Sequence, residues 1–231
     1  MSPIKSNLAK QEVAREIFNT LKTRIIKWDY LPGQRLTEEA ISNEFGVSRI
    51  PVRDALRMLI DNGYVVKEAY KGYHVTNIDL RQIRELYELR LALELYAVAK
   101  ATEKFRQEDW QSLFDYWGEI PDPVIEDADE LTREDENFHL TIARQSDNKQ
   151  LILILTQIFE RLRVIRIYDF SSPERTVKTF QQHRRILECI REKQIQEAQA
   201  AITENILGSE DNVEKSVAHT LSQAYLKTIQ T

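Results

Sequence analysis

Four polar side chains stand on helical faces that are otherwise apolar in the second half of the chain. Asp135 and His139 are four residues apart and project from one face of one helix, as two metal ligands on a helix must. His183 and Asn205 stand on the apolar faces of two later helices. A buried carboxylate or imidazole is costly unless it is paired or bound to a metal. The pattern indicates either a divalent metal site or a cluster held by structural hydrogen bonds.

A second group of residues suited to recognition lies in the first half. Arg49, Arg53 and Arg57 recur every four residues, so they form a cationic stripe beside the apolar stripe of the same helix. Ser48 is a good N-cap for that helix. One packed face and one cationic face are what a helix needs to meet phosphates and base edges in DNA, although a solvated surface is the plainer alternative. The spacing predicts a recognition helix.

The surrounding elements complete a small DNA-binding domain. Apolar periodicity predicts a first helix from residue 13 to about 28, and Thr37 can cap a short second helix. The recognition helix follows, with Gly63 at its end. Residues 65–66 and 73–75 then read as a two-stranded wing whose tip is 70–72. The expected fold is a winged helix-turn-helix.

Residues 10–76 resemble the N-terminal domain of the GntR family of bacterial transcription regulators. The run Gly-Val-Ser-Arg-x-Pro-Val-Arg at 46–53 is the specific part of the match. The resemblance implies that Arg49 enters the major groove, that Arg53 contacts the backbone or bases, and that Gly72 approaches the minor groove.

Further phosphate contacts are expected around the same surface. Ser48 would donate to a phosphate from the helix N-terminus, where the dipole favours an anion. Arg35 and Lys71 are additional candidates. Glu38 and Glu39 depart from the more basic pattern of some relatives in the short second helix, so we assign that helix no DNA contacts.

The rest of the chain is predicted to be helical throughout, which makes the protein mainly α. Six helices are expected, at about 80–105, 110–117, 131–146, 149–168, 174–193 and 196–226. This half resembles the FCD effector domain of the FadR-type branch of the GntR family. The predicted domains are residues 1–76 for DNA binding, a linker at 77–79, and 80–231 for effector binding and dimerisation.

The same resemblance extends to the polar cluster. Metal-binding FCD domains use an Asp-x3-His pair and two later histidines about twenty-two residues apart. Asp135, His139 and His183 match this pattern, whereas Asn205 replaces the expected last histidine. The expected cofactor is a divalent ion, Zn, Ni or Mn. Within that set Asn205 favours manganese over tetrahedral zinc, because an amide oxygen is a weaker and harder ligand than imidazole. Some branches of the family have lost the metal.

Three arginines are candidates for binding an effector. The resemblance makes Arg90 a clamp for a carboxylate, for which a guanidinium offers bidentate geometry. A local ion pair between Arg90 and Glu94 is the structural alternative. Arg163 and Arg166, set among apolar residues, are further candidates for lining the cavity.

The charge distribution agrees with this division. The net charge is −5, but residues 1–78 carry 12 Lys and Arg against 9 Asp and Glu, and residues 79–231 carry 20 against 28. A mildly basic front half suits a DNA partner. One cysteine, no membrane-length apolar run and no signal-peptide core predict a cytoplasmic protein that contacts no membrane.

The predicted function is a ligand-responsive transcription regulator, a repressor, that binds a palindromic duplex operator as a homodimer and takes a small organic acid as effector. Two recognition helices are needed because one reads only a few base pairs. A metal-dependent hydrolase or nuclease using the Asp/His cluster is the alternative. The sequence has no separate general base at a recognisable spacing, no phosphate-binding Gly-rich loop and no nucleophile motif, so we expect no enzyme. A nonspecific architectural DNA binder is disfavoured by the acidic second half.

Overall fold

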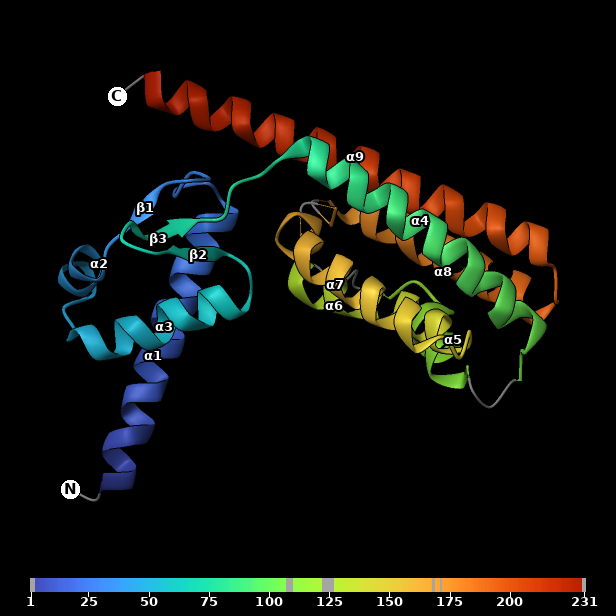
Figure 1. Ribbon diagram of the computed structural model, residues 1–231, viewed down its shortest axis with the longest axis horizontal. Coiled ribbons are helices and arrows are strands. Elements are labelled where there is room, and N and C mark those ends of the chain that lie inside the picture. The colour runs from blue at the N-terminus through green and yellow to red at the C-terminus, as the bar shows by residue number, and fades with distance from the viewer. Residues whose placement is uncertain (1–2, 107–109, 122–126, 168, 171, 230–231) are drawn as a thin grey trace. The chain divides into compact units, whose positions relative to one another are not determined.

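A computed structural model describes residues 3–106, 110–121, 127–167, 169–170 and 172–229 (Figure 1). The chain forms two compact units, Met1–Ile78 with Thr220–Thr231 and Asp79–His219. The described residues are predominantly helical, as expected.

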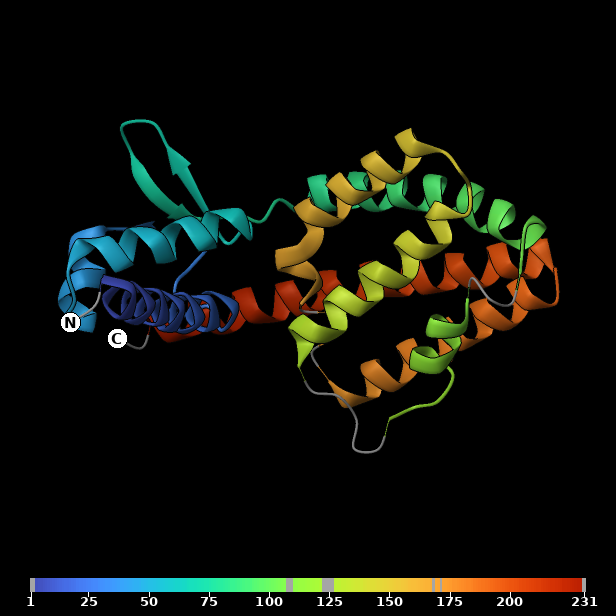
Figure 2. The same ribbon diagram turned by 90° about the horizontal axis from the view of Figure 1, so that it is seen from below.

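Residues 3–78 form three helices and a small sheet, with α1 at Pro3–Ile26, β1 at Arg35–Leu36, α2 at Glu38–Phe45, α3 at Arg49–Asp61, β2 at Val65–Glu68 and β3 at Gly72–Val75. Figure 2 shows the hairpin of β2 and β3 projecting beyond these helices. The sequence predicted two strands, whereas the sheet has three in the order β1-β3-β2. Strand β1 was missed because two residues are too short to show alternation.

The predicted turn chemistry explains how α2 leads into α3. The hydroxyl of Thr37 accepts from the Ala40 amide at the start of α2, and Gly46 ends that helix in the left-handed conformation at φ +64°. Helix α3 packs on α1 through apolar side chains that are fully buried on both helices. These are Val52, Leu56 and Leu59 on α3 and Ile17, Leu21 and Ile25 on α1.

After residue 78 the described residues form six helices, as predicted: α4 at Leu80–Glu103, α5 at Gln111–Trp117, α6 at Ala128–Arg144, α7 at Lys149–Arg166, α8 at Pro173–Arg191 and α9 at Ile195–Ile229. The second unit takes α9 as far as His219. Asp79, Asp127, Asn148 and Ser172 cap four of these helices with side-chain oxygens. Helix α6 begins earlier than expected because Asp127 caps it. Residues 122–126, between α5 and α6, lie outside the described residues.

Helix α4 packs on α6, α7 and α8, and α6 packs on α7. The polar residues of interest therefore lie on the mutually facing sides of these helices. Among the described residues, no helix is long and apolar enough to cross a bilayer.

Candidate functional site

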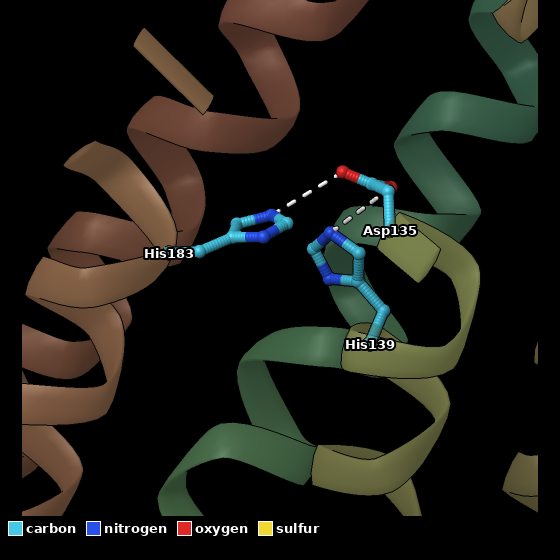
Figure 3. Close-up of side chains that lie close together, drawn as sticks. All are labelled: Asp135, His139 and His183. Atoms are coloured by element: carbon cyan, nitrogen blue, oxygen red, sulfur yellow. Dashed lines mark ion pairs between the residues drawn. The ribbon is translucent and has the colours of Figure 1, made fainter. Parts of the chain in front are cut away.

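Asp135, His139 and His183 come together in the interior of the six-helix unit. Asp135 and His139 lie on α6 and His183 on α8, and ligand atoms of the three lie within 4.8 Å of one another. Figure 3 shows both imidazoles facing the Asp135 carboxylate. His183 Nε2 is 3.2 Å from Asp135 Oδ1, and His139 Nε2 is 3.6 Å from Oδ2. The three predicted ligands are thus adjacent and buried.

Aromatic packing fixes the ring of His183. Phe138 stacks on it with ring centroids 3.8 Å apart and 2° between the planes, and Trp117 meets it edge-on at 4.2 Å. Because both neighbours are themselves buried, the imidazole cannot turn toward water. Burial lowers the pKa of His183 to about 4, against the opposing attraction of Asp135, so the ring is neutral near pH 7.

The orientation of His139 is set from its other side. Its Nδ1 contacts Oε2 of Glu94 on α4, and Oε1 of Glu94 accepts from Arg90 Nε at 2.6 Å. Burial favours the neutral acid, but His139 and Arg90 outweigh it and lower the pKa of Glu94. A carboxylate at Nδ1 directs the Nε2 lone pair toward Asp135.

Asp135 is shared between the histidines and a buried arginine. Arg166 on α7 contacts Asp135 Oδ2 through Nη2. Burial alone would raise the pKa of Asp135, but Arg166 foremost, with His139 and His183, holds it well below its usual range. The aspartate is therefore charged, with one oxygen toward the guanidinium and the other toward His183.

Several buried donors in this cluster have no hydrogen-bond acceptor among the described residues. They are Arg90 Nη1, Arg166 Nε and Gln182 Nε2, whereas Arg166 Nη1 has only the long contact to Glu136 at 3.5 Å. Both guanidinium carbons lie 5.0 Å from the ring centre of Phe159, so the two arginines flank one aromatic side chain. Buried donors left without acceptors are costly, and an anionic ligand would satisfy them.

Asn205 on α9 is buried and is hydrogen-bonded through its nitrogen. Its Nδ2 donates to Oε1 of Gln182 at 3.2 Å, and the same oxygen accepts from Arg175 Nη1 at 3.3 Å. Arg175 in turn pairs with Asp169 at 2.7 Å. This arrangement turns the amide nitrogen of Asn205 toward Gln182, the neighbour of His183.

Arg163 occupies a different position from Arg90 and Arg166. Its side chain is 37% exposed and pairs with Glu136 at 2.7 Å, whereas Arg166 is fully buried. Arg166 Nη1 also lies 3.5 Å from Glu136, so that carboxylate joins the two arginines. Of the three predicted effector arginines, Arg90 and Arg166 are the ones brought to the cluster.

The predicted DNA-contacting side chains lie on the surface of the first unit. Ser48, Arg49 and Arg53 are exposed at the start of α3, and the Ser48 hydroxyl makes no capping bond. Arg49 lies 3.7 Å from Glu39, and Arg53 Nε donates to Glu38 at 2.8 Å. The N-terminus of α3 is therefore open to an anion.

The remaining predicted contacts lie on the wing. Gly72 adopts φ +93° at the start of β3, and a Cβ built there would stand 3.9 Å from Nε of Arg35 on β1. A conformation with positive φ favours glycine at this position. Lys71 is exposed at the tip and pairs with Glu68 at 2.8 Å.

Sequence reasoning missed three partners of the cluster. Glu94 was considered only as a local partner of Arg90, and neither Gln182 nor Phe159 was singled out. Glu94 carried a usable signal, because it stands one helical turn after Arg90 on the buried face of α4. Gln182 precedes His183 and gave no periodic signal, since neighbouring residues face different sides of a helix.

Two family models match the chain. The model described as bacterial regulatory proteins, gntR family, matches residues 13–75, and the FCD domain model matches residues 85–207.

Relatives extend over most of the chain. The uncharacterized HTH-type transcriptional regulator YdhC of Bacillus subtilis is 28% identical over 77% of this chain and 80% of its own length. The HTH-type transcriptional repressor RspR of Escherichia coli is 26% identical over 85% and 86%. A solved structure of Lar, which controls expression of the Listeria monocytogenes agr system, is 22% identical, covers 87% of this chain and 96% of its own, and superposes with a TM-score of 0.62.

Proposed function

The chain belongs to the GntR family of bacterial regulatory proteins and carries an FCD domain, and from this membership we propose that it is a cytoplasmic, homodimeric repressor released from a palindromic operator by a small carboxylate. The matched domains and relatives are those of DNA-binding transcription regulators and not of enzymes. The name of the Escherichia coli relative supports repression as the direction of control.

Operator recognition is assigned to the exposed start of α3. Arg49 and Arg53 are 59% and 61% exposed on adjacent turns, which suits side chains that must reach base edges and phosphates. Ser48 receives a phosphate at the helix N-terminus. Lys71 and Gly72 meet the neighbouring stretch of backbone and minor groove from the wing.

Dimer formation is assigned to an apolar surface shared by α4 and α7. Helix α4 is buried on one side, yet Leu89, Leu93 and Tyr96 form a second apolar stripe at helical spacing. Leu93 and Tyr96 of α4 line a groove together with Ile154 of α7. Leu153, the residue before Ile154, is half exposed. A helix that is apolar on both sides must bury its second side as well, and we assign that role to the same surface of a second chain.

The effector site is assigned to the buried donors around Phe159. The single observation that carries this proposal is that Arg90 and Arg166 flank Phe159 while keeping guanidinium nitrogens without acceptors among the described residues. A carboxylate fits these donors, and the aromatic ring fits an apolar body of modest size. Because Arg90 lies on α4 and Arg166 on α7, a ligand bound to both would connect these two helices.

A divalent cation fits the adjacent triad. Asp135 is ionised, His183 is neutral, and Glu94 directs the Nε2 of His139 toward the same point. Asn205 is assigned as the fourth ligand, by its amide oxygen. When bound, the ion supplies positive charge and open coordination positions for an oxygen ligand such as a carboxylate.

Regulation follows if the effector prefers one arrangement of the helices. A ligand shifts an equilibrium only by its difference in affinity for the two states. We propose that the carboxylate favours dimers whose wings no longer match the operator spacing.

The test is a ligand screen read by two signals, thermal unfolding and release of an operator duplex. Small mono-, di- and hydroxycarboxylates are each compared with the neutral amide of the same acid. We expect at least one acid, and not its amide, to raise the Tm and weaken DNA binding; saturation at one hundred times Kd adds about 2.7 kcal/mol to the stability. Equal stabilisation by acid and amide, or none by any acid, would contradict the arginine clamp.

A further inference from the structure

One carboxylate joins three elements of the DNA-binding unit. Glu38, in the first turn of α2, accepts from Arg53 Nε on α3 at 2.8 Å through Oε2. Its other oxygen, Oε1, lies 3.4 Å from the hydroxyl of Tyr73 on β3 of the wing. The Glu38 side chain is only 19% exposed, whereas Arg53 is 61% exposed. The Glu38 carboxylate is therefore much less accessible to solvent than the guanidinium group that it binds.

This contact is not explained by stability. An ion pair with one partner so exposed contributes little to folding, because solvent screens it. An acid beside a DNA-binding surface also repels phosphates, so its presence weakens binding to every duplex. A side chain that weakens binding to every duplex can still favour one sequence over others if it improves contacts that only that sequence makes.

The geometry of the ion pair shows which nitrogens of Arg53 are engaged by Glu38. Glu38 occupies Nε of Arg53 and leaves the two terminal nitrogens of the guanidinium for a ligand. Those two nitrogens form the fork that recognises a guanine edge or a phosphate in bidentate fashion. Holding the long side chain before binding removes part of the entropy lost on contact.

We propose that Glu38 is a positioning residue for sequence recognition, which aims Arg53 and couples its placement to the wing through Tyr73. The inference rests on the proposed DNA-binding role of α3. It assigns to α2 an indirect part in specificity, although no side chain of α2 need touch DNA.

Glu39 offers a matched control on the next residue. It is 73% exposed and lies 3.7 Å from Arg49, a distance without a direct hydrogen bond. Glu38→Gln and Glu39→Gln remove the same charge from adjacent positions of α2. They differ in whether a carboxylate that is hydrogen-bonded to an arginine is lost.

The experiment uses the full chain and two DNA probes: a duplex enriched by the wild type from a random library, and the unselected library. Glu38→Gln is expected to bind the enriched duplex about tenfold more weakly and the unselected library as tightly as wild type or more so. Glu39→Gln is expected to leave the ratio of the two affinities unchanged. In an Arg53→Ala background, Glu38→Gln should no longer reduce the ratio.

A second variant guards against loss of folding. Glu38→Asp keeps the charge but shortens the side chain. This variant should lose its preference for the enriched duplex over the library, while its thermal unfolding stays close to that of wild type. If Glu38→Gln raises affinity for both probes alike, or if its effect persists without Arg53, Glu38 acts by charge alone and the inference is overturned. A wild type that enriches no sequence would instead refute the proposed recognition by α3.

Discussion

Nδ1 of His139 contacts the Glu94 carboxylate across the interface of α4 and α6. The contact joins a proposed metal ligand to the helix that carries Arg90, a proposed effector ligand, because Glu94 also accepts from Arg90. The proposed metal site and the proposed effector site thus share one carboxylate. A change in either site alters the hydrogen bonding available to the other.

Glu94→Gln should weaken binding of a divalent cation. Loss of a carboxylate that orients a ligating histidine typically reduces metal affinity about 10- to 100-fold. Competition with a chromophoric chelator measures this. Glu85→Gln, on the exposed side of the same helix, should leave the affinity unchanged. Equal affinity in Glu94→Gln and wild type would show that Glu94 does not orient His139 for a metal.

Elemental analysis tests the assigned ligands. Purified wild type is expected to hold a near-stoichiometric divalent ion, and His183→Ala should lose it while the DNA-binding unit stays folded. His219→Ala, in which an exposed histidine of α9 is removed, is the control. Metal found only in Asn205→His would mean that Asn205 has abolished the site. Unchanged metal in His183→Ala would mean that the ligands are misassigned.

Arg166→Met should destabilise the six-helix unit strongly. Removing one partner of a buried pair costs about 3–5 kcal/mol, because Asp135 would keep an unpaired buried charge. Arg163→Met should cost about 1 kcal/mol or less, because Arg163 is partly exposed and Glu136 keeps Arg166 at 3.5 Å. Urea unfolding measures both values.

Adding Asp135→Asn to Arg166→Met should recover part of the lost stability, because the unpaired charge is then removed. If Arg166→Met costs no more than Arg163→Met, Arg166 does not neutralise Asp135.

Ile154→Asp should separate the dimer. The charge would enter the apolar groove between α4 and α7, where it has no partner across the proposed symmetric contact. Leu207→Asp changes a similarly exposed leucine on α9 and should leave the dimer intact. Sedimentation equilibrium distinguishes the species. Dimers persisting in Ile154→Asp would place the interface elsewhere.

Arg49→Ala and Lys71→Ala should change DNA binding in different ways. Loss of Arg49 is expected to cost about 1–3 kcal/mol per half-site and to relax base preference, because it removes a contact to base edges. Loss of Lys71 should weaken binding to all duplexes alike and reduce the salt dependence. Titrations of selected and random duplexes compare them. Equal losses of affinity for both duplexes in Arg49→Ala would show that Arg49 does not contact base edges in the major groove.

Much of the fold was predictable because its signals are local. Thr37, Asp79 and Ser172 act as N-caps as their residue types indicate, and Gly46 and Gly63 take the left-handed conformation that ends a helix. The turn between α8 and α9 was poorly signalled for a physical reason. Lys193 adopts φ +58° there, a conformation that lysine rarely takes and that no turn residue announces.

The candidate site was predictable only in part. Residues on one helix, such as Asp135 and His139, reveal their shared face through spacing. Contacts between helices far apart in the chain depend on packing that no local pattern encodes, as with Glu94 and His139 or Arg166 and Asp135. The same holds for Glu38 and Arg53, since two helices had to be placed before the ion pair was evident.

The most direct test of the central claim is selection of duplexes from a random library by the full chain, followed by measurement of the stoichiometry on the enriched sequence. We predict a palindrome with half-sites about one helical turn apart, bound by two chains. Enrichment of no sequence, or of an asymmetric site bound by one chain, would contradict recognition by a homodimer.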